Sequence, residues 1–313
     1  MNLISLIGGV GRSARGGGFA RPLYRVRAAL DGVARTLGRP PLRATTPQGV
    51  RFHGYLRHRG FMRHLPSAAY ETVTTGLLER LLAPDVVFVD GGAHIGYYTV
   101  FAATRAGRVE AFEPDPYNLA ALRYNHAHAL DAAGRARTTI HPLALSGEAG
   151  ETVLYVSDTT IGNSLARRGD IGELREVRVR STTLDQVLAG LGGARCVIKI
   201  DVEGAESRVL EGGRAALARI PEVAIIAETN PSALAAAGTS PQALVGQLRE
   251  LGFAVRYLDE KTGAAVEADA AILARKGNLL ALRGDSWGGP GGAVEAPAAA
   301  AGDPARAEGA WTP

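Results

Sequence analysis

The sequence has a single cysteine, Cys196, so no disulfide bond can form within one chain. This scarcity fits a reducing compartment, and we expect a cytoplasmic protein. Cys196 lies in the apolar run CVIKI, which is typical of a small buried side chain and not of a nucleophile. The sequence also lacks a run of about 18 apolar residues and the leading positive charges of a signal peptide. It therefore predicts no transmembrane helix.

Acidic residues are nearly absent from residues 1–65, which hold twelve arginines and one acid, Asp31. The whole chain has a net charge of +4 and a pI of about 9.4. A basic arm over residues 1–66 is typical of proteins that meet a membrane surface or an anionic partner, but Arg and Ala are abundant throughout, and we favour that simpler explanation. Few aromatic residues alternate with these arginines, so we expect no nucleic-acid partner. Residues 21–38 have the apolar spacing of a helix.

Predicted strands and helices alternate regularly from about residue 85 onward. Buried runs such as VVFVD and CVIKI are followed by amphipathic segments. This order predicts an α/β fold with a mostly parallel sheet, helices on both faces, and last strands that pair antiparallel. We place this domain at residues 67–283, with a first helix capped by Ser67, and expect residues 150–190 to form a hairpin and a lid over the site. Residues 284–313 are rich in Gly, Ala and Pro, which predicts a disordered tail.

The turn after the first strand, in VVFVDGGAHIGYYTVFAA, has the features of a ligand site. Asp90, Gly92 and Gly96 have the spacing D-x-G-x-x-x-G, whereas a pyrophosphate-binding loop has G-x-G-x-x-G. Glycines let a ligand approach the backbone, and the following helix offers unpaired N–H groups. The carboxylate of Asp90 opposes a diphosphate and favours a cationic ligand such as S-adenosylmethionine. A helix cap or turn is the alternative role for Asp90.

Other residues at strand ends complete the expected cofactor site. Glu113 ends the second strand, 23 residues after Asp90, where a carboxylate accepts hydrogen bonds from ribose hydroxyls. NAD-dependent enzymes share this feature, and a surface acid is the alternative. We expect adenine to meet the backbone of Ala144, Leu145 and Ser146 after the third strand, and His94 to pack locally at the glycine turn.

The segment KIDVEGAE follows the fourth strand and is the candidate catalytic edge. Its charged residues come directly after a buried run, where charge is costly unless it is paired or functional. We expect Asp201 or Glu203 to take a proton from the acceptor or to orient it, and Lys199 to set the charge of that group. Glu206 falls in a first helical turn, so the helix dipole alone also explains it. We retain it as a candidate acceptor-binding residue.

Two further residues are candidates on the acceptor side. Ser164, in the lid segment NSLARRG, is placed to bind an acceptor, although an ordinary loop serine fits equally well. Glu228 ends the fifth strand and points to the same edge of the sheet. We expect Arg167 and Arg168 to be solvated loop residues. The histidines show no recurrent ligand spacing, so the sequence predicts no metal site.

Four motifs, VFVDGGAHIGYYTVFAA, VEAFEPDPYNLAALRYN, STTLDQVL and VIKIDVEGAESRVLEGG, resemble the FkbM-type methyltransferases in order and spacing. This resemblance covers about residues 70–283 and implies a seven-stranded class I methyltransferase fold that uses S-adenosylmethionine. It implies that Asp90, Gly92, Gly96 and Glu113 line the cofactor site. The family commonly has a branched apolar residue where this chain has Gly91.

The function predicted from these observations is methyl transfer from S-adenosylmethionine, most simply to a hydroxyl of a sugar or a secondary metabolite. The resemblance implies a small-molecule or glycan acceptor and does not choose between them. Two alternatives stay open: a nicotinamide-dependent oxidoreductase on a similar sheet, and a methyltransferase-like module that only binds partners. The missing G-x-G-x-x-G argues against the first, and the set Asp90, Glu113, Asp201 and Glu203 argues against the second. The sequence leaves the oligomeric state open.

Overall fold

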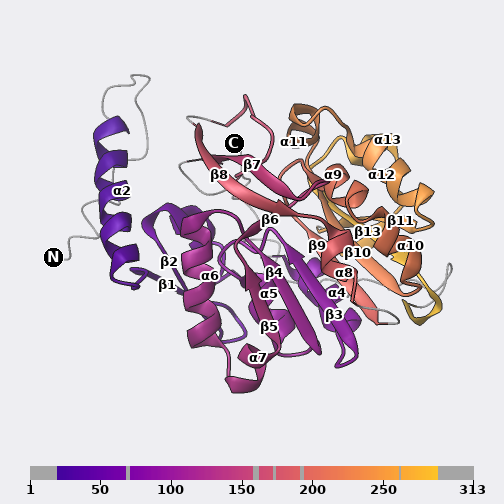
Figure 1. Cartoon of the computed structure of the whole chain (residues 1–313), viewed down its shortest axis with the longest axis horizontal. Coiled ribbons are helices and arrows are strands. Elements are labelled where there is room, and N and C mark those ends of the chain that lie inside the picture. The colour runs from indigo at the N-terminus through magenta and orange to yellow at the C-terminus, as the bar shows by residue number, and fades with distance from the viewer. Residues whose placement is uncertain are drawn as a thin grey trace.

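The computed structural model describes residues 20–67, 71–157, 162–171, 174–190, 194–260 and 262–287 (Figure 1). Its main element is an eight-stranded sheet with the strand order β12-β11-β13-β10-β9-β3-β4-β5. Five neighbouring strands are parallel, and β13 lies antiparallel between β10 and β11. The predicted α/β fold with antiparallel last strands is confirmed. The strands are β3 (Val86–Gly91), β4 (Arg108–Phe112), β5 (Thr138–His141), β9 (Arg195–Ile200), β10 (Val223–Thr229), β11 (Ala254–Asp259), β12 (Ala264–Val266) and β13 (Gly277–Arg283).

Helices connect these strands and begin at recognisable capping residues. The Asp115 carboxylate accepts hydrogen bonds from the backbone N–H groups of Tyr117 and Asn118, and Pro116 occupies the first turn of α6. Asn230 and Ser240 cap α11 and α12 in the same way. The helices are α4 (Thr72–Leu81), α5 (Tyr97–Ala103), α6 (Pro116–Ala129), α7 (Ala132–Ala136), α8 (Leu184–Leu188), α9 (Glu206–Glu211), α10 (Arg214–Arg219), α11 (Pro231–Ala236), α12 (Pro241–Glu250) and α13 (Ala270–Leu273).

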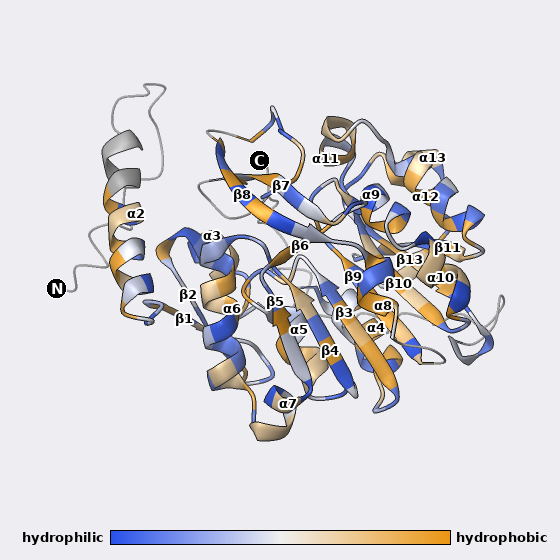
Figure 2. Cartoon of the chain, viewed as in Figure 1, coloured by the Kyte–Doolittle hydropathy of each residue, from blue (hydrophilic) through white to orange (hydrophobic). Residues whose placement is uncertain are grey.

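The sheet is buried on both faces. Val87 and Val89 of β3 pack into one hydrophobic cluster, whereas Val86 and Phe88 pack into another. Successive side chains of a strand point to opposite faces, so the two clusters lie on opposite sides of the sheet. Figure 2 shows hydrophobic residues along the central strands and hydrophilic residues on the outer surfaces of the helices. Burial on both faces explains why these strands read as continuous apolar runs.

The predicted third strand, TTIHPLALS (residues 138–146), divides between the large sheet and a second, smaller sheet that also contains the predicted hairpin. The strand is interrupted at Pro142, after which β6 (Leu143–Leu145) leaves β5 and pairs with β8. The hairpin is present as β7 (Gly150–Ser157) and β8 (Leu174–Thr182), which pair antiparallel. The resulting order is β6-β8-β7. The segment after β7 folds back, so that the backbones of Tyr155 and Ser164 exchange two hydrogen bonds.

The N-terminal segment packs directly on the large sheet domain. It comprises α2 (Ala20–Thr36), β1 (Leu42–Thr45), β2 (Arg51–Gly54), the 3-10 helix η1 (Leu56–His58) and α3 (Arg59–Met62). The fully buried Asn125 of α6 accepts a hydrogen bond from the His53 backbone N–H at 2.7 Å. Its amide group donates to the carbonyls of His53 at 3.0 Å and Ile95 at 2.8 Å. One side chain thus ties the N-terminal segment to the turn after β3.

Two predicted boundaries differ from those observed. The helix expected to be capped by Ser67 begins at Thr72, with Glu71 at its N-cap in a left-handed conformation; residues 68–70 lie outside the described residues. The disordered tail was predicted from residue 284, but Asp285–Trp287 form a 3-10 helix, η2, in which Trp287 is buried under the Arg195 guanidinium. The rest of that tail, and residues 1–19 of the arm, lie outside the described residues. Within the described ranges, no helix combines the length and apolarity needed to cross a membrane.

Candidate functional site

The candidate site lies where the sheet connections reverse direction. Strands β3 and β9 are neighbours, but the chain continues from β3 to β4 on one side and from β9 to β10 on the other. Such a reversal opens a crevice at the carboxyl ends of the strands. A cavity of about 450 Å³ occupies this place, which is within the range of small-molecule sites. Its wall includes Gly92, His94, Phe112, Glu113, Asn118, Ala144, Leu145, Asp201, Glu203, Glu228 and Lys276.

Strained backbone concentrates at this cavity. The non-glycine residues with positive φ in the described ranges are Glu71, His94 and Glu203, with φ values of 50°, 52° and 52°. All three line the cavity. Such conformations cost on the order of 1–3 kcal/mol each and persist only where the surroundings impose them. The three strained residues of the described ranges therefore share one location, the cavity wall.

The glycines of the turn after β3 combine positive φ values at Gly92 and Gly96 with close neighbouring atoms. Gly92 has a φ of +86°, and a Cβ there would overlap the carbonyl oxygen of Asp201. Gly96 has a φ of +94°, and a Cβ there would lie 2.6 Å from Leu122. At Gly91, where the family commonly has a branched residue, a Cβ would lie 2.9 Å from Leu145. The glycine turn therefore lets β3 and β9 approach closely below the cavity.

Glu113 is placed as the sequence predicts for a cofactor-binding carboxylate. It lines the cavity and is only 4% exposed. Its two carboxylate oxygens accept hydrogen bonds from the backbone N–H groups of His94 and Asp115, both at 2.8 Å. Burial, with the nearby charge of Asp115, raises the pKa of Glu113 to about 8. The carboxyl group is thus fixed in orientation and holds its proton unusually tightly.

The N-terminal segment contributes to the same wall. The His94 ring lies edge-on to Phe61 and His58, with ring centroids 4.6 and 5.3 Å apart, and burial lowers the pKa of His94 to about 4. His58 is fully buried, and its Nε2 lies 3.0 Å from Oδ1 of the cavity-lining Asn118. His94 therefore packs against residues of the basic arm, and its contacts are not confined to the glycine turn where local packing was predicted. These contacts cross the predicted boundary between residues 66 and 67.

Asp90 lies beside the cavity but is not part of its described wall. Its carboxylate is 2% exposed and accepts a hydrogen bond from the Thr99 hydroxyl of α5 at 2.5 Å. Burial raises its pKa to about 6 against the opposing effects of Thr99 and Lys199. The geometry matches the alternative role of a turn carboxylate, because Asp90 links the end of β3 to the helix that follows it.

The expected adenine segment does reach the cavity. Ala144 and Leu145 of β6 line it, together with Phe112, whose ring stacks on His141 at a centroid distance of 4.5 Å. The backbone N–H of Ser146 donates to the carbonyl of Thr182 and is therefore occupied within the small sheet. The wall here is apolar, which suits the face of an aromatic ring.

Lys199 and Asp201 form an ion pair at the end of β9. Lys199 is 1% exposed, and its Nζ lies 3.0 Å from the Asp201 carboxylate. Burial lowers the pKa of Lys199, but the negative charges of Asp201, Glu71 and Glu228 outweigh burial and raise it. Burial raises the pKa of Asp201, but the Lys199 and Lys276 charges outweigh this effect and lower it. Asp201 thus faces the cavity as an ionised carboxylate.

Glu203 is held in its strained conformation by the lid segment. Ser164 is 1% exposed, and its hydroxyl donates to the Glu203 carbonyl at 2.7 Å. Arg168 donates from Nη1 to the Glu203 carboxylate at 2.7 Å and makes two further bonds to Asp170. The expectation that Arg168 is solvated is wrong, because it is 7% exposed and fully paired by these acids. Ser164 itself is absent from the described cavity wall and acts on the site through Glu203.

Glu228 meets a lysine that sequence analysis did not identify. Its Oε1 lies 2.9 Å from the Lys276 Nζ, whereas its buried Oε2 has no hydrogen-bond partner among the described residues. Burial and the charges of Asp201 and Glu203 raise the pKa of Glu228 well above its usual value, and Lys276 opposes them. Glu228 therefore presents an unsatisfied carboxyl oxygen near Asp201.

Glu206 binds the backbone of the loop that precedes α9. It is 1% exposed, and its carboxylate accepts hydrogen bonds from the backbone N–H groups of Gly204, at 2.9 Å, and Val202, at 3.2 Å. Burial raises its pKa to about 7. These contacts match the alternative role of a first-turn carboxylate, and Glu206 is not part of the described cavity wall.

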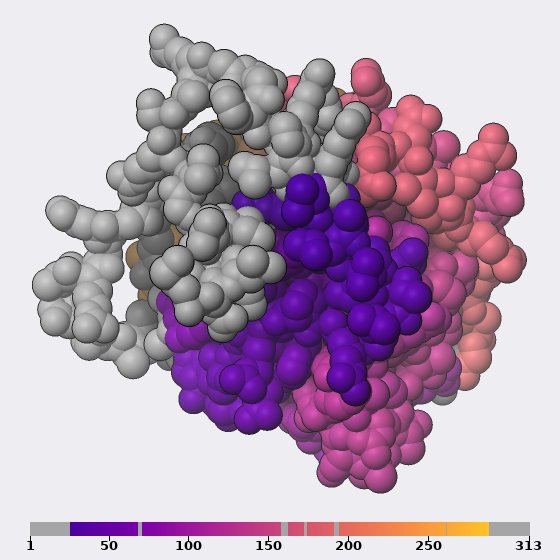
Figure 3. Space-filling model, turned by 90° about the vertical axis from the view of Figure 1, so that its left-hand side faces the viewer, coloured from indigo at the N-terminus to yellow at the C-terminus, as the bar shows by residue number. Residues whose placement is uncertain are grey.

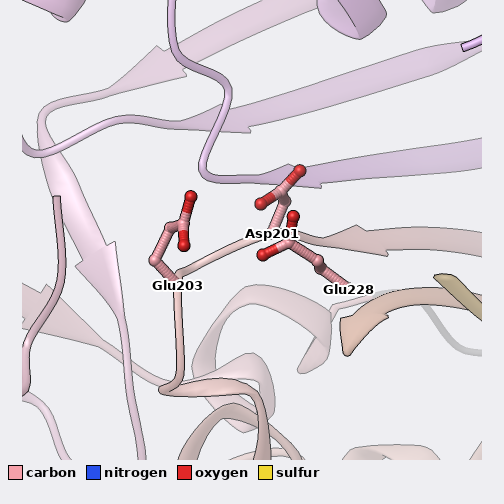
Figure 4. A group of neighbouring side chains, drawn as sticks. All are labelled: Asp201, Glu203 and Glu228. Atoms are coloured by element: carbon pink, nitrogen blue, oxygen red, sulfur yellow. The ribbon is translucent and has the colours of Figure 1, made fainter. Parts of the chain in front are cut away.

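The carboxylates of Asp201, Glu203 and Glu228 converge, with one oxygen of each within 4.8 Å of the others (Figure 4). Such a group can ligate a divalent cation. Here each carboxylate has a basic partner: Lys199 at 3.0 Å, Arg168 at 2.7 Å and Lys276 at 2.9 Å, respectively. A metal ion would compete with these cations, and the sequence-based expectation of no metal site stays a prediction.

Lys276 and Glu71 are the main site residues that sequence reasoning missed. A signal for the lysine was present, because only three of the 35 Lys and Arg residues are lysine, and Lys199 and Lys276 both lie at the site. Glu71 carried no signal, because it precedes α4 on a segment far from the strand ends. Its carboxylate accepts a hydrogen bond from the Tyr98 hydroxyl at 2.8 Å.

Comparisons with solved structures return methyltransferases. The methyltransferase FkbM of Methylobacillus flagellatus KT is 14% identical, with 82% of this chain and 70% of that chain covered and a TM-score of 0.41. The precorrin-6y C5,15-methyltransferase of Geobacter metallireducens is 15% identical, with 74% and 95% covered and a TM-score of 0.40. At these TM-scores, the fold assignment rests on the strand order and not on superposition.

Sequence comparisons identify the family. A curated relative, the AMB antimetabolite synthetase AmbE of Pseudomonas aeruginosa, is 31% identical over 216 residues, which cover 56% of this chain and 10% of the relative. This chain thus matches about a tenth of that protein's length. The family model of the methyltransferase FkbM domain matches residues 90–255, which contain the glycine turn, Glu113 and the KIDVEGAE segment. Since this match covers more than half of the chain, the protein belongs to the FkbM methyltransferase family.

Proposed function

We propose that this protein transfers a methyl group from S-adenosylmethionine to a hydroxyl oxygen of a small metabolite or a sugar. One observation carries the proposal: a single cavity wall joins the glycine turn and Glu113 to the carboxylates of Asp201, Glu203 and Glu228. Family membership favours methyl transfer over the nicotinamide-dependent alternative. The converging carboxylates of Asp201, Glu203 and Glu228 beside the cofactor half of the cavity favour a catalytic domain over a module that only binds partners.

The residues at the ends of β3 and β4 fit an adenosyl cofactor. Gly92 lines the cavity without a side chain, and each Glu113 oxygen keeps a lone pair beyond its backbone hydrogen bond. We assign Gly92, Gly96, Glu113 and the apolar wall at Ala144 and Leu145 to cofactor binding. When bound, S-adenosylmethionine supplies an electrophilic methyl group. Asp90 acts indirectly, by holding β3 against α5 through Thr99.

The acceptor half of the cavity, which contains Asp201, Glu203 and Glu228, orients a hydroxyl group of the acceptor. Asp201 is ionised beside Lys199, so it accepts a hydrogen bond from an acceptor O–H and aligns the oxygen. Alignment of this kind supplies up to roughly 7–11 kcal/mol of rate acceleration in well-oriented cases. Glu203 is fixed by Arg168 and Ser164, and we assign it a second contact with the acceptor.

Glu228 is our candidate for the group that receives the acceptor proton. The buried Oε2 of Glu228 has no hydrogen-bond partner among the described residues, and its raised pKa makes ionised Glu228 a stronger proton acceptor than Asp201, whose pKa is lowered. Ionised Glu228 would take the proton of the acceptor O–H at its free Oε2, while bound S-adenosylmethionine would supply the methyl group and leave as S-adenosylhomocysteine when its methyl–sulfur bond breaks. Lys276 holds the other oxygen and limits how far the pKa rises.

The acceptor class follows from the site and from the relative. Three converging carboxylates suit an acceptor rich in O–H or N–H donors, such as a sugar or an amino-group-bearing metabolite. The description of the relative as an antimetabolite synthetase favours a small secondary metabolite. A cytoplasmic location remains our expectation from the cysteine content.

Ligand binding is tested first, by thermal unfolding with S-adenosylmethionine, S-adenosylhomocysteine or NAD. A ligand at one hundred times its Kd stabilises the native state by about 2.7 kcal/mol. We expect the two adenosyl sulfur compounds to raise the Tm and NAD to leave it unchanged. Stabilisation by NAD alone would refute the cofactor assignment.

Turnover is tested with labelled cofactor against sugars and hydroxylated metabolites. Asp201→Asn, Glu203→Gln and Glu228→Gln should each retain cofactor binding and lose activity, with Glu228→Gln slower by about 10²–10⁴-fold as a lost general base. Glu79→Gln is the matched control, because Glu79 is an exposed carboxylate paired only with Arg105 in the described structure. Wild-type turnover in all three site variants would exclude this catalytic assignment.

A further inference from the structure

The exposed large apolar side chains of the described residues gather on one helix. They are Val26, Leu30, Val33 and Leu37, which are 51%, 43%, 59% and 67% exposed. Their spacing places them on one face of α2 and the residue that follows it. We call these four residues the α2 stripe. Because single exposed apolar residues are ordinary but an aligned set is not, the stripe points to a binding surface.

The other face of α2 fixes the helix to the protein. Asp31 is 1% exposed, and its carboxylate accepts hydrogen bonds from the backbone N–H groups of Leu56 at 2.7 Å and Arg57 at 3.1 Å. Arg35 lies over the Tyr117 ring at 4.9 Å. The helix is therefore held in one orientation, with the α2 stripe facing outward. Figure 3 shows the N-terminal segment in indigo on this side of the molecule.

The surface around the stripe is strongly basic. Residues 27–63 hold eight arginines, and their one acid is Asp31, which is buried. The described surface of this segment thus has no exposed acidic side chain to balance its exposed arginines, which are Arg35, Arg39, Arg43, Arg51 and Arg63. An occupant of this surface must therefore be apolar along one line and anionic around it.

We propose that the N-terminal segment docks on a membrane surface that contains anionic lipids. An interfacial helix buries its apolar face at the headgroup boundary while flanking arginines attract lipid phosphates. A second copy of this chain fits less well, because it would bring two acid-free basic faces together. The same segment lines the active-site cavity through Phe61 and His64, so docking brings the enzyme to lipid-linked or membrane-associated acceptors. The docking itself is independent of the proposed methyl transfer.

The test is flotation of the full chain with vesicles of phosphatidylcholine alone or with added phosphatidylglycerol. Val33→Asp with Leu37→Asp removes the most exposed part of the stripe, and Arg39→Glu with Arg43→Glu reverses two exposed charges that follow it in the chain. Arg214→Glu with Arg219→Glu on α10 is the matched control, because it makes the same charge change at exposed positions elsewhere. Thermal unfolding checks that each variant folds.

We expect wild type and the α10 control to float with the anionic vesicles only, and less so as salt is added. The stripe variant and the arginine variant should each bind the anionic vesicles at least about tenfold more weakly than wild type. Equal flotation of the stripe variant and wild type would overturn the proposal, as would no flotation of wild type. Sedimentation velocity tests whether a second copy of the chain occupies the stripe instead. If wild type does not float but forms a dimer, and Val33→Asp with Leu37→Asp dissociates that dimer, the occupant is a second copy and the membrane proposal is wrong.

Discussion

Glu113 offers a sharp test of the cofactor site, because its burial couples ligand binding to a proton. Burial raises its pKa to about 8, so at pH 7 about nine-tenths of the ligand-free molecules carry it protonated. Ribose hydroxyls donate hydrogen bonds, which favour the ionised carboxylate. Binding of S-adenosylhomocysteine at pH 7 should therefore release about 0.9 proton from Glu113, and the affinity should rise about tenfold from pH 7 to pH 9.

The same pKa shift predicts how the ligand-free fold depends on pH. The folded pKa of Glu113 lies above the unfolded value of 4.5, so its contribution is fully present below pH 4.5 and is lost as the pH rises through about 8. The full shift corresponds to an upper bound of about 5 kcal/mol in the free energy of unfolding. Glu113→Gln should therefore unfold with a weaker pH dependence between these limits.

Proton release is measured by titration calorimetry in two buffers that differ in ionisation enthalpy. The comparison uses wild type, Glu113→Gln and Glu110→Gln. Glu110 is the matched control, since it lies on β4 just before Glu113 and is 3% exposed, but it contacts His141 and Arg108 and is not part of the described cavity wall. The amino group of the ligand titrates equally in all three proteins, so the difference isolates Glu113. Equal proton release by wild type and Glu113→Gln would refute the reasoning.

Three further predictions concern the turn, the acceptor side and the N-terminal segment. Gly92→Ala should abolish stabilisation by S-adenosylhomocysteine in thermal unfolding and lower the Tm, because its Cβ would overlap the Asp201 carbonyl at a φ of +86°; an unchanged ligand response would contradict this. Lys276→Met should move the pH–rate optimum upward, because it removes the cation 2.9 Å from Glu228 and leaves the raised pKa unopposed. An identical profile would remove Glu228 from the proton path. Asn125→Ala should lower the free energy of unfolding in denaturant by about 1–3 kcal/mol, because it leaves backbone groups of His53 and Ile95 without their hydrogen-bond partner. An unchanged free energy of unfolding would show that water replaces the side chain.

The central sheet could be predicted because the amino-acid composition of its strands identifies them. Buried strands such as Val86–Gly91 read as continuous apolar runs, and in β3 and β9 an acid, Asp90 or Asp201, stands at the end of the run. The break at Pro142 could not be predicted. The segments before and after the proline both read as strand, and nothing in the sequence reveals that they join different sheets. The start of α4 at Thr72 also depends on tertiary contacts, since Glu260 binds Val73 and Thr74 there.

Some residues of the candidate site could also be predicted from the sequence, and others could not. Gly92, Glu113, Asp201 and Glu228 line one cavity because parallel strands end at one edge of the sheet, which is a property of topology that sequence order reveals. Arg168 could not be placed, because its burial results from a loop that folds across the acceptor side and pairs it with Glu203. Nothing local distinguishes such an arginine from a solvated one.

The two halves of the cavity use carboxylates in opposite ways, and this contrast explains the choice of cations. Glu113 has no basic partner in the described structure and keeps its proton until a ligand supplies donors. Asp201 and Glu228 face Lys199 and Lys276 instead, in a chain that otherwise uses arginine almost throughout. A lysine ammonium is a compact charge that neutralises one carboxylate oxygen and leaves the rest of the group free, whereas an arginine fork occupies both oxygens, as Arg168 does at Asp170. Lysine is therefore the cation that holds an acid in place while leaving an oxygen for the acceptor.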